Sequence, residues 1–187
     1  MKQQSQKLVR WLKDLKLRDV AAVGGKNAAL GEMFSHFAKL GIAVPNGFAV
    51  TARAYREFLK LSGLEAKIKA TLKGLDTKNV KALQACGRTV RNLILRSPLP
   101  VQVEQEISEA YRQLGQLYVQ NPDVAVRSSA TAEDLPGASF AGQQETFLNV
   151  TGQTAVLESV KKCFASLFTD RAISYRADKG FSHFDVA

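Results

Sequence analysis

Apolar residues recur at steps of three and four along most of this chain, which is the spacing of amphipathic helices. From Lys26 onward the spacing predicts a helix with Glu32 and His36 on its polar face, ended by Gly41. Its apolar face is expected to carry Leu30, Met33, Phe34, Phe37 and Leu40. This helix would follow a turn at Gly24-Gly25, because a glycine pair interrupts regular structure.

The middle of the chain, about residues 62–120, shows the same helical spacing three times over. The prolines in Ser97–Pro100 separate the second of these predicted helices from the third, because proline cannot continue a helix. The expected core-facing residues are Leu64, Ile68 and Leu72, then Val80, Leu83, Gly87, Val90 and Ile94, and then Val103, Ile107, Ala110, Leu114 and Tyr118. We expect core packing and no chemistry from these stripes.

Short segments rich in β-forming residues lie between the helical ones. Strands are predicted at 8–12, 48–50, 123–127 and 145–150, with 123–127 expected to be buried. Further helices are predicted at 52–61, 156–168 and 171–178. A few strands with helices inserted between them indicate the α+β class.

Composition narrows the function without fixing it. With 187 residues, 45% hydrophobic and 23% charged, the chain has the make-up of an ordinary globular protein. Its net charge of +9 favours an anionic partner, either nucleotide or nucleic acid. No RNP, zinc-finger or KH pattern occurs, so we expect a nucleotide and no nucleic acid. The sequence contains no apolar run as long as the about 20 residues that are needed to span a membrane, so a cytoplasmic location is expected. Cys86 and Cys163 are expected to be buried thiols.

Two places combine a cation with glycine or small residues, which suits phosphate. Lys26 follows Gly24-Gly25 at a helix entry, where exposed N–H groups and the helix dipole favour an anion. The spacing is not that of a Walker A loop, because Val20 stands where the first glycine would be. A GGK of this kind also occurs at ordinary helix entries, so the residues alone leave both interpretations open.

Arg127 ends a predicted strand and precedes a loop of small residues, 128–144, that could fold over a polyphosphate. An ordinary surface loop remains the alternative from the residues alone. Glu133 and Asp134 are interpreted as solvated acids. Neither His36 nor His183 has a partner in reach along the sequence, so no catalytic residue and no metal ligand is predicted in this chain.

At these residues the chain resembles the phosphoenolpyruvate synthases (pyruvate, water dikinases). The resemblance is carried by VGGKNAALGEM at 23–33, VPNGFAVTARAYREFL at 44–59, VAVRSSATAEDLPGASFAGQQETFLNV at 124–150 and SLFTDRAISYRADKG at 166–180. The 27-residue stretch from 124 to 150 is the most specific. Rifampicin phosphotransferases share it and are the competing family.

The resemblance implies an ATP-grasp-like fold in which two lobes clamp ATP. Residues 1–187 would be a partial ATP-binding domain, with the helical segment 62–120 inserted. Lys26 and Arg127 would contact the phosphates of ATP, and the loop around Ser139, Gly142 and Gln143 would cover the nucleotide. ATP would be used with Mg²⁺, whose ligands are expected outside this chain.

Complete enzymes of the family convert ATP, pyruvate and water into phosphoenolpyruvate, AMP and phosphate through a phosphohistidine. The second ATP-grasp lobe, the phosphohistidine domain and the pyruvate-binding barrel are expected beyond residue 187, so this chain alone would be inactive. Its partners would be ATP and either the remaining C-terminal portion or a second copy. A free-standing, non-catalytic nucleotide-binding module is the alternative from a different functional class.

Overall fold

Runs of helices are separated by short strands that form small antiparallel sheets, as expected for the α+β class. The computed structural model describes residues 7–131, 134–135, 138–139 and 145–187. Its helices are α1 (Val20–Val23), α2 (Gly25–Lys39), α3 (Ala52–Leu61), α4 (Leu64–Leu72), α5 (Val80–Arg96), α6 (Val101–Leu117), α7 (Gln153–Ser166) and α8 (Asp170–Asp178). Its strands are β1 (Val9–Trp11), β2 (Phe48–Val50), β3 (Val124–Arg127), β4 (Asp134–Leu135), β5 (Ala138–Ser139) and β6 (Thr146–Val150).

The described strands form three separate antiparallel pairs: β1 with β2, β3 with β6, and β4 with β5. In the first pair Val9 lies opposite Val50, and in the second Arg127 lies opposite Thr146. The predicted strands at 8–12, 48–50 and 145–150 are confirmed. The strand at 123–127 is present as well, but Ala125 and Arg127 are exposed, so the expectation of a fully buried strand is wrong.

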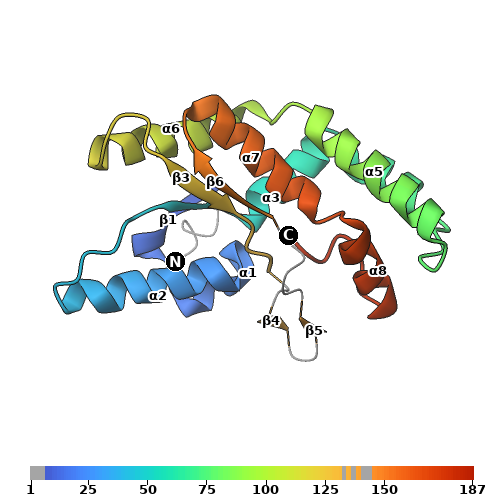
Figure 1. Ribbon diagram of the computed structural model, residues 1–187, viewed down its shortest axis with the longest axis horizontal. Coiled ribbons are helices and arrows are strands. Elements are labelled where there is room, and N and C mark those ends of the chain that lie inside the picture. The colour runs from blue at the N-terminus through green and yellow to red at the C-terminus, as the bar shows by residue number, and fades with distance from the viewer. Residues whose placement is uncertain (1–6, 132–133, 136–137, 140–144) are drawn as a thin grey trace.

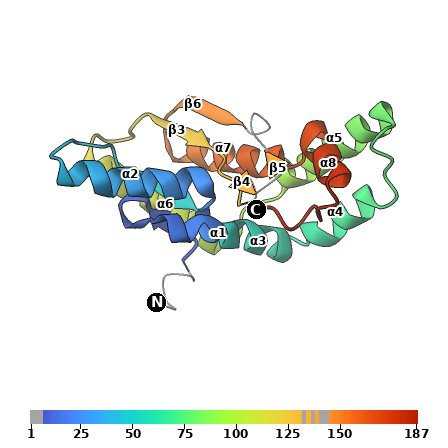
Figure 2. The same ribbon diagram turned by 90° about the horizontal axis from the view of Figure 1, so that it is seen from below.

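The molecule is long, and different helices lie at its two ends (Figures 1 and 2). Helix α2 lies toward one end, while α4, α5 and α8 lie at the other. Helix α7 packs against both β3 and β6, and against α5 and α6 on other sides. The β3–β6 pair is therefore held between the two ends. No helix in the described segments has both the length and the apolar character needed to cross a membrane.

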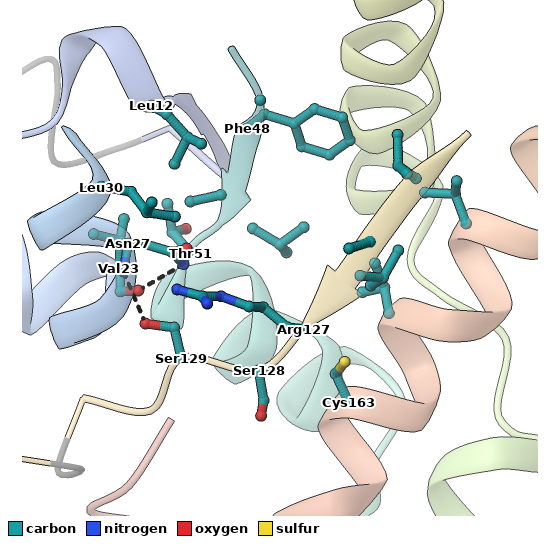
Figure 3. Close-up of a pocket in the computed structure, with 18 of the residues that line it drawn as sticks. Leu12, Val23, Asn27, Leu30, Phe48, Thr51, Arg127, Ser128, Ser129 and Cys163 are labelled. Carbon is teal, nitrogen blue, oxygen red and sulfur yellow. Dashed lines mark hydrogen bonds between the residues drawn. The ribbon is translucent and has the colours of Figure 1, made fainter. Parts of the chain in front are cut away.

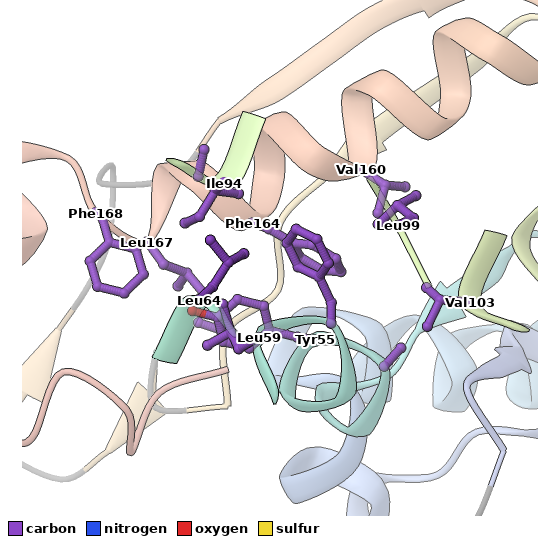
Figure 4. Packing of buried hydrophobic residues seen from close by; sticks show 14 of the residues in the cluster. Tyr55, Leu59, Leu64, Ile94, Leu99, Val103, Val160, Phe164, Leu167 and Phe168 are labelled. Atoms are coloured by element: carbon purple, nitrogen blue, oxygen red, sulfur yellow. The ribbon is translucent and has the colours of Figure 1, made fainter. Parts of the chain in front are cut away.

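A large core built from aromatic and branched side chains joins α3 to α8 (Figure 4). Phe58 is fully buried and its ring stacks 5.7 Å from that of Phe164, which also lies 5.1 Å from the ring of Tyr55. The three predicted helical stripes mostly face this core. Two of their members do not, because Val80 is 61% exposed and Tyr118 is 54% exposed at the ends of their helices.

Two buried polar groups tie the large core together. The Tyr111 hydroxyl donates to the carbonyl of Pro122 at 2.8 Å and accepts the N–H of Gly152 at 2.8 Å, which links α6 to the starts of β3 and α7. Arg176 is fully buried, and its Nε donates to His183 Nδ1 at 3.1 Å. His183 thus has a partner, contrary to expectation, and burial lowers its pKa to about 4.

A second, smaller core lies beneath α2, and its buried members among the described residues are Leu15, Val23, Ala28 and Ala49. Gly31 lets α2 approach Leu15 so closely that a Cβ at this glycine would be 2.5 Å from the Leu15 carbonyl oxygen. Small residues, Ala28 and Gly31, therefore form the buried face of α2. The predicted apolar face is wrong for Met33 and Leu40, which are 47% and 61% exposed. Gly41 does end this helix, with a left-handed φ of 71°.

The two cysteines differ in their surroundings. Cys163 is buried on α7, as expected, and its thiol pKa is raised to about 12, chiefly by burial and secondarily by the charge of Glu145. Cys86 on α5 is only half-buried, so the expectation of a buried thiol is wrong there. Its Sγ lies 3.5 Å from the carbonyl oxygen of Thr71.

Candidate nucleotide site

The Gly24-Gly25-Lys26 turn and the segment after Arg127, which are far apart in the sequence, lie next to each other in the structure. Gly24 lies between α1 and α2 with φ 79°, and a Cβ at this position would be 2.0 Å from the carbonyl oxygen of Ser129. The Asn27 N–H, in the first turn of α2, donates to Ser129 Oγ at 3.2 Å (Figure 3). The glycine turn and the segment that follows β3 are thus in direct contact, more than 100 residues apart in sequence.

Two separate reasons require glycine at position 24. A left-handed φ is strained for residues with a side chain. Any side chain at Gly24 would also collide with the backbone of Ser129, which cannot move aside as a side-chain tip could. Ser129 therefore fixes the N-terminus of α2 relative to the end of β3.

A cavity of about 490 Å³ opens beside this contact. It lies between the small core and the large core, and its walls come from α2, β2, β3, the segment after β3, and α7. The lining includes Asn27, Leu30, Phe48, Thr51, Val124, Val126, Arg127, Ser128, Ser129, Val156, Val160, Cys163 and Phe164. A concave site with an apolar majority and a few converging polar groups is the usual form of a small-molecule site.

The polar groups gather at one side of the cavity. Figure 3 shows the Arg127 side chain extending from β3 toward the N-terminus of α2, where Asn27 and Ser129 lie. Arg127 is exposed, and its side chain makes no hydrogen bond or ion pair with the other residues that the structure describes. Its five N–H donors are therefore directed toward a place where backbone N–H groups and hydroxyls already converge.

The apolar wall comes from the opposite side, where β3 and α7 face the cavity. Val126, Val156 and Phe164 lie here beside Cys163. Because its pKa is raised to about 12, the Cys163 thiol stays protonated at neutral pH and acts as a small apolar group. The cavity thus offers an apolar surface and a cationic, donor-rich surface within one space, which is the pair of features that a nucleotide needs.

The other predicted site residues are placed differently. Lys26 is half-buried in the first turn of α2 and is not among the residues that line the cavity, although its neighbour Asn27 is. Ser139 belongs to the short strand β5, in register with Asp134 of β4. Gly142 and Gln143 lie outside the described residues. The roles predicted for these four residues remain predictions.

The sequence analysis did not identify several residues that line the cavity, or the contact of the C-terminus with the segment after β3. Asn27 and Thr51 lie within two of the motifs quoted above, at 23–33 and 44–59, but neither was singled out as a site residue. The C-terminal segment also reaches the site: the Thr131 N–H donates to the Ala187 carbonyl at 2.9 Å, and the Ala187 N–H donates to Thr131 Oγ1 at 3.3 Å. Within the described residues, no group of three potential metal ligands occurs.

Comparison with known proteins shows which family the chain belongs to. A family model described as "Pyruvate phosphate dikinase, AMP/ATP-binding domain" matches residues 20–187. The chain belongs to this family. The match begins just before the glycine turn and includes every lining residue of the cavity except Leu12.

Curated relatives of this family member are phosphoenolpyruvate synthases. That of Synechocystis sp. is 52% identical over an alignment 185 residues long, which covers 96% of this chain and 23% of the relative. Those of Aquifex aeolicus and Escherichia coli are 52% and 51% identical, covering 97% and 98% of this chain but 21% and 23% of the relatives. The chain thus spans less than a quarter of their length, and it corresponds to the ATP-binding part of phosphoenolpyruvate synthases.

Proposed function

We propose that the cavity binds ATP, with the polyphosphate beside Arg127 and the first turn of α2 and the adenine against the wall formed by β3 and α7. The observation that carries this proposal is the convergence of the Arg127 side chain, Asn27 and Ser129 at one side of an otherwise apolar cavity. A guanidinium and helix N-terminal N–H groups are donors that suit phosphate oxygens.

Lys26 would complete the phosphate site from the same turn of α2. A flexible four-carbon side chain allows its ammonium group to reach a bound phosphate without lining the cavity itself. Ser139, Gly142 and Gln143 would cover the nucleotide from the segment between β3 and β6. Mg²⁺ would be held by groups outside this chain together with the phosphates, since Asp123 is the only acid in the cavity lining within the described residues.

In this proposal residues 1–187 form one lobe of an ATP-grasp-like clamp, and the helical segment 62–120 is an insertion in it. The complete protein would then transfer phosphate from ATP to a histidine and on to pyruvate, giving phosphoenolpyruvate, AMP and phosphate. What supports this is the identity of about half of all residues with phosphoenolpyruvate synthases over nearly the whole chain. Pyruvate is favoured as the acceptor over rifampicin for the same reason.

Calorimetry of the chain with ATP and Mg²⁺ tests the binding site. We expect Arg127→Ala to weaken ATP binding by about tenfold or more, because a charge-assisted hydrogen bond contributes about 1.5–3 kcal/mol. Lys26→Ala should weaken it too. The matched control is Arg112→Ala, which removes an exposed arginine that pairs with Glu109 on α6 and does not line the cavity. Equal affinities for all four proteins would contradict the proposal.

A chimeric enzyme tests the activity proposed for the complete protein. The matching region of the Escherichia coli relative would be replaced by this chain, and pyruvate-dependent formation of AMP would be measured. We expect activity that is lost with Arg127→Ala and kept with Arg112→Ala. A chimera that folds and binds ATP but forms no AMP with pyruvate would contradict the assigned reaction while leaving the nucleotide site intact.

A further inference from the structure

The positive charge of the chain is concentrated in one helical hairpin. Residues 60–96 contain nine of the 26 basic residues but only two of the 17 acidic ones, so the rest of the chain has a net charge of only +2. This segment runs from Lys60, near the end of α3, through α4 and α5, and α4 and α5 pack against each other. No acidic residue occurs from Thr77 to Val103, a stretch that includes all of α5.

The cations of α5 lie on the face that points away from the core. Its buried residues are Leu83, Gly87, Val90 and Ile94. Lys81, Arg88 and Arg96 are all exposed and follow one another at steps of seven and eight residues, which places them on the opposite side of the helix. The exposed residues between them on this stripe are Ala85 and Asn92, which are small and uncharged. We call Lys81, Ala85, Arg88, Asn92 and Arg96 the basic stripe.

The basic stripe is remote from the nucleotide cavity, since no residue of α4 or α5 lines that cavity. Figures 1 and 2 show α5 at the end of the molecule opposite α2. ATP binding therefore leaves the stripe unexplained. Arg91, on a different side of α5, is already used: it donates to the Phe168 carbonyl at 2.7 Å and pairs with Asp170 at 3.0 Å.

We propose that the basic stripe of α5 docks an acidic amphipathic helix of a protein partner. At a rise of 1.5 Å per residue, steps of seven and eight residues separate the three cations by about 10–12 Å along the axis. Acidic residues repeated every seven residues on a partner helix lie about 10.5 Å apart, which is close to both steps. Ala85, between the first two cations, allows a second helix to come close.

Two features favour a protein helix over a nucleic acid. Val80 and Leu95, which flank the stripe, are 61% and 39% exposed and could cover the apolar face of an amphipathic helix, whereas a phosphate backbone offers them nothing. Residues 60–96 also contain no aromatic residue, so this segment cannot stack nucleic acid bases.

Fluorescence anisotropy with a labelled helical peptide tests this proposal on the full chain. The probe is a 21-residue peptide of about three repeats of Glu-Ile-Ala-Ala-Leu-Glu-Gln, whose charges recur at heptad spacing. Its control is a scrambled peptide of the same composition. We expect the ordered peptide to bind at least tenfold more tightly than the scrambled one. Equal binding of both would overturn the proposal, since charge alone would then suffice.

Charge reversal on the chain locates the site. K81E/R88E/R96E should weaken peptide binding by tenfold or more, and K81Q/R88Q/R96Q should weaken it as well if the reversed triple does not fold. The matched control is K13E/R18E/K39E, which reverses three exposed cations elsewhere and should change binding by less than threefold. Equal losses in both triples would overturn the proposal.

A 12-nucleotide RNA in the same assay distinguishes the other class of partner. We expect it to bind more weakly than the ordered peptide at 150 mM salt. Tighter binding of RNA that depends on Lys81, Arg88 and Arg96 would overturn the protein helix in favour of a nucleic acid.

Discussion

The two buried clusters of this chain are built in opposite ways. The large core uses rings and branched side chains such as Phe58, Phe164 and Ile94, which fill volume. The small core beneath α2 relies on Gly31, Ala28 and the tight contact of Gly24 with Ser129, where backbones meet. The cavity lies between them. The comparison suggests that the large core supplies most of the stability, while close backbone contacts set the position of α2 beside the cavity.

Removing a ring from the large core should have the largest effect on stability. Phe58→Ala deletes a fully buried ring that stacks on Phe164, so we expect a loss of about 3–5 kcal/mol in the free energy of unfolding. Urea denaturation measures it. The control is Leu61→Ala on the same helix, where a 68% exposed side chain should change stability by less than about 0.5 kcal/mol. Similar losses for both variants would break the comparison.

Adding a methyl group to the small core should destabilise the protein by less. In Gly31→Ala the new Cβ would lie 2.5 Å from Leu15 backbone and side-chain atoms, so α2 must shift, at a cost of about 1–3 kcal/mol. Gly115→Ala on α6 is the opposite case, because its Cβ would meet its nearest neighbour at 3.5 Å.

Gly115→Ala should therefore stabilise the protein by up to about 1 kcal/mol, since alanine favours a helix more than glycine does. Thermal and urea unfolding of the two glycine variants should move in opposite directions. Stabilisation by Gly31→Ala would show that α2 is not held by close approach.

Acid should weaken the large core through His183. Its folded pKa of about 4 is lower than the ordinary value of 6.5, because burial and the charge of Arg176 disfavour its protonated form. The unfolded chain thus takes up the proton first, so the stabilising contribution is complete above pH 6.5 and is lost as the pH falls toward 4. Because His183 is only half-buried, we expect a discounted loss of about 1–2 kcal/mol.

Urea midpoints measured between pH 7 and pH 4.5 test this expectation. His183→Gln should flatten the pH dependence, because glutamine does not titrate. His36→Gln provides the matched control: His36 is exposed on α2, and its replacement should leave the slope as it is. An unchanged slope in His183→Gln would contradict the assigned role.

The smallest effect is expected at the contact between the two motifs. Ser129→Ala removes the acceptor of the Asn27 N–H at the start of α2, which should cost about 1 kcal/mol, the usual cost of losing a helix cap. Ser129→Thr keeps a hydroxyl and should cost less. Hydrogen exchange of the Asn27 amide measures the contact directly. Equally slow exchange in Ser129→Ala would show that the hydroxyl does not hold this amide.

Local signals predicted much of the fold. Gly41 was predicted to stop a helix, and α2 ends just before it; the helix predicted at 52–61 is present as α3. The proline break at 98–100 separates α5 from α6 as predicted. These features depend on residues that are close together in the sequence, so they can be predicted from local sequence patterns.

Long-range features escaped prediction for a physical reason. The apolar stripe of α2 was expected to be buried, but small residues permit closer packing, and Gly31 faces Leu15 instead. His183 gains its partner Arg176 only when the C-terminal segment folds back. At the candidate site, Arg127 was predicted and lies in the cavity, whereas Asn27 and Ser129 acquire their importance from a contact that no local pattern encodes.

The most direct test of the account is where ATP binds on the chain. In a sample with labelled Leu and Val methyl groups, NMR spectra recorded during titration with ATP and Mg²⁺ would follow Leu30, Val126 and Val156, which line the cavity, and Val80 and Leu95, which lie on α5. The account predicts shifts of the first three signals, with adenosine alone shifting Val126 and Val156. Shifts confined to Val80 and Leu95, or no shift at any ATP concentration, would contradict it.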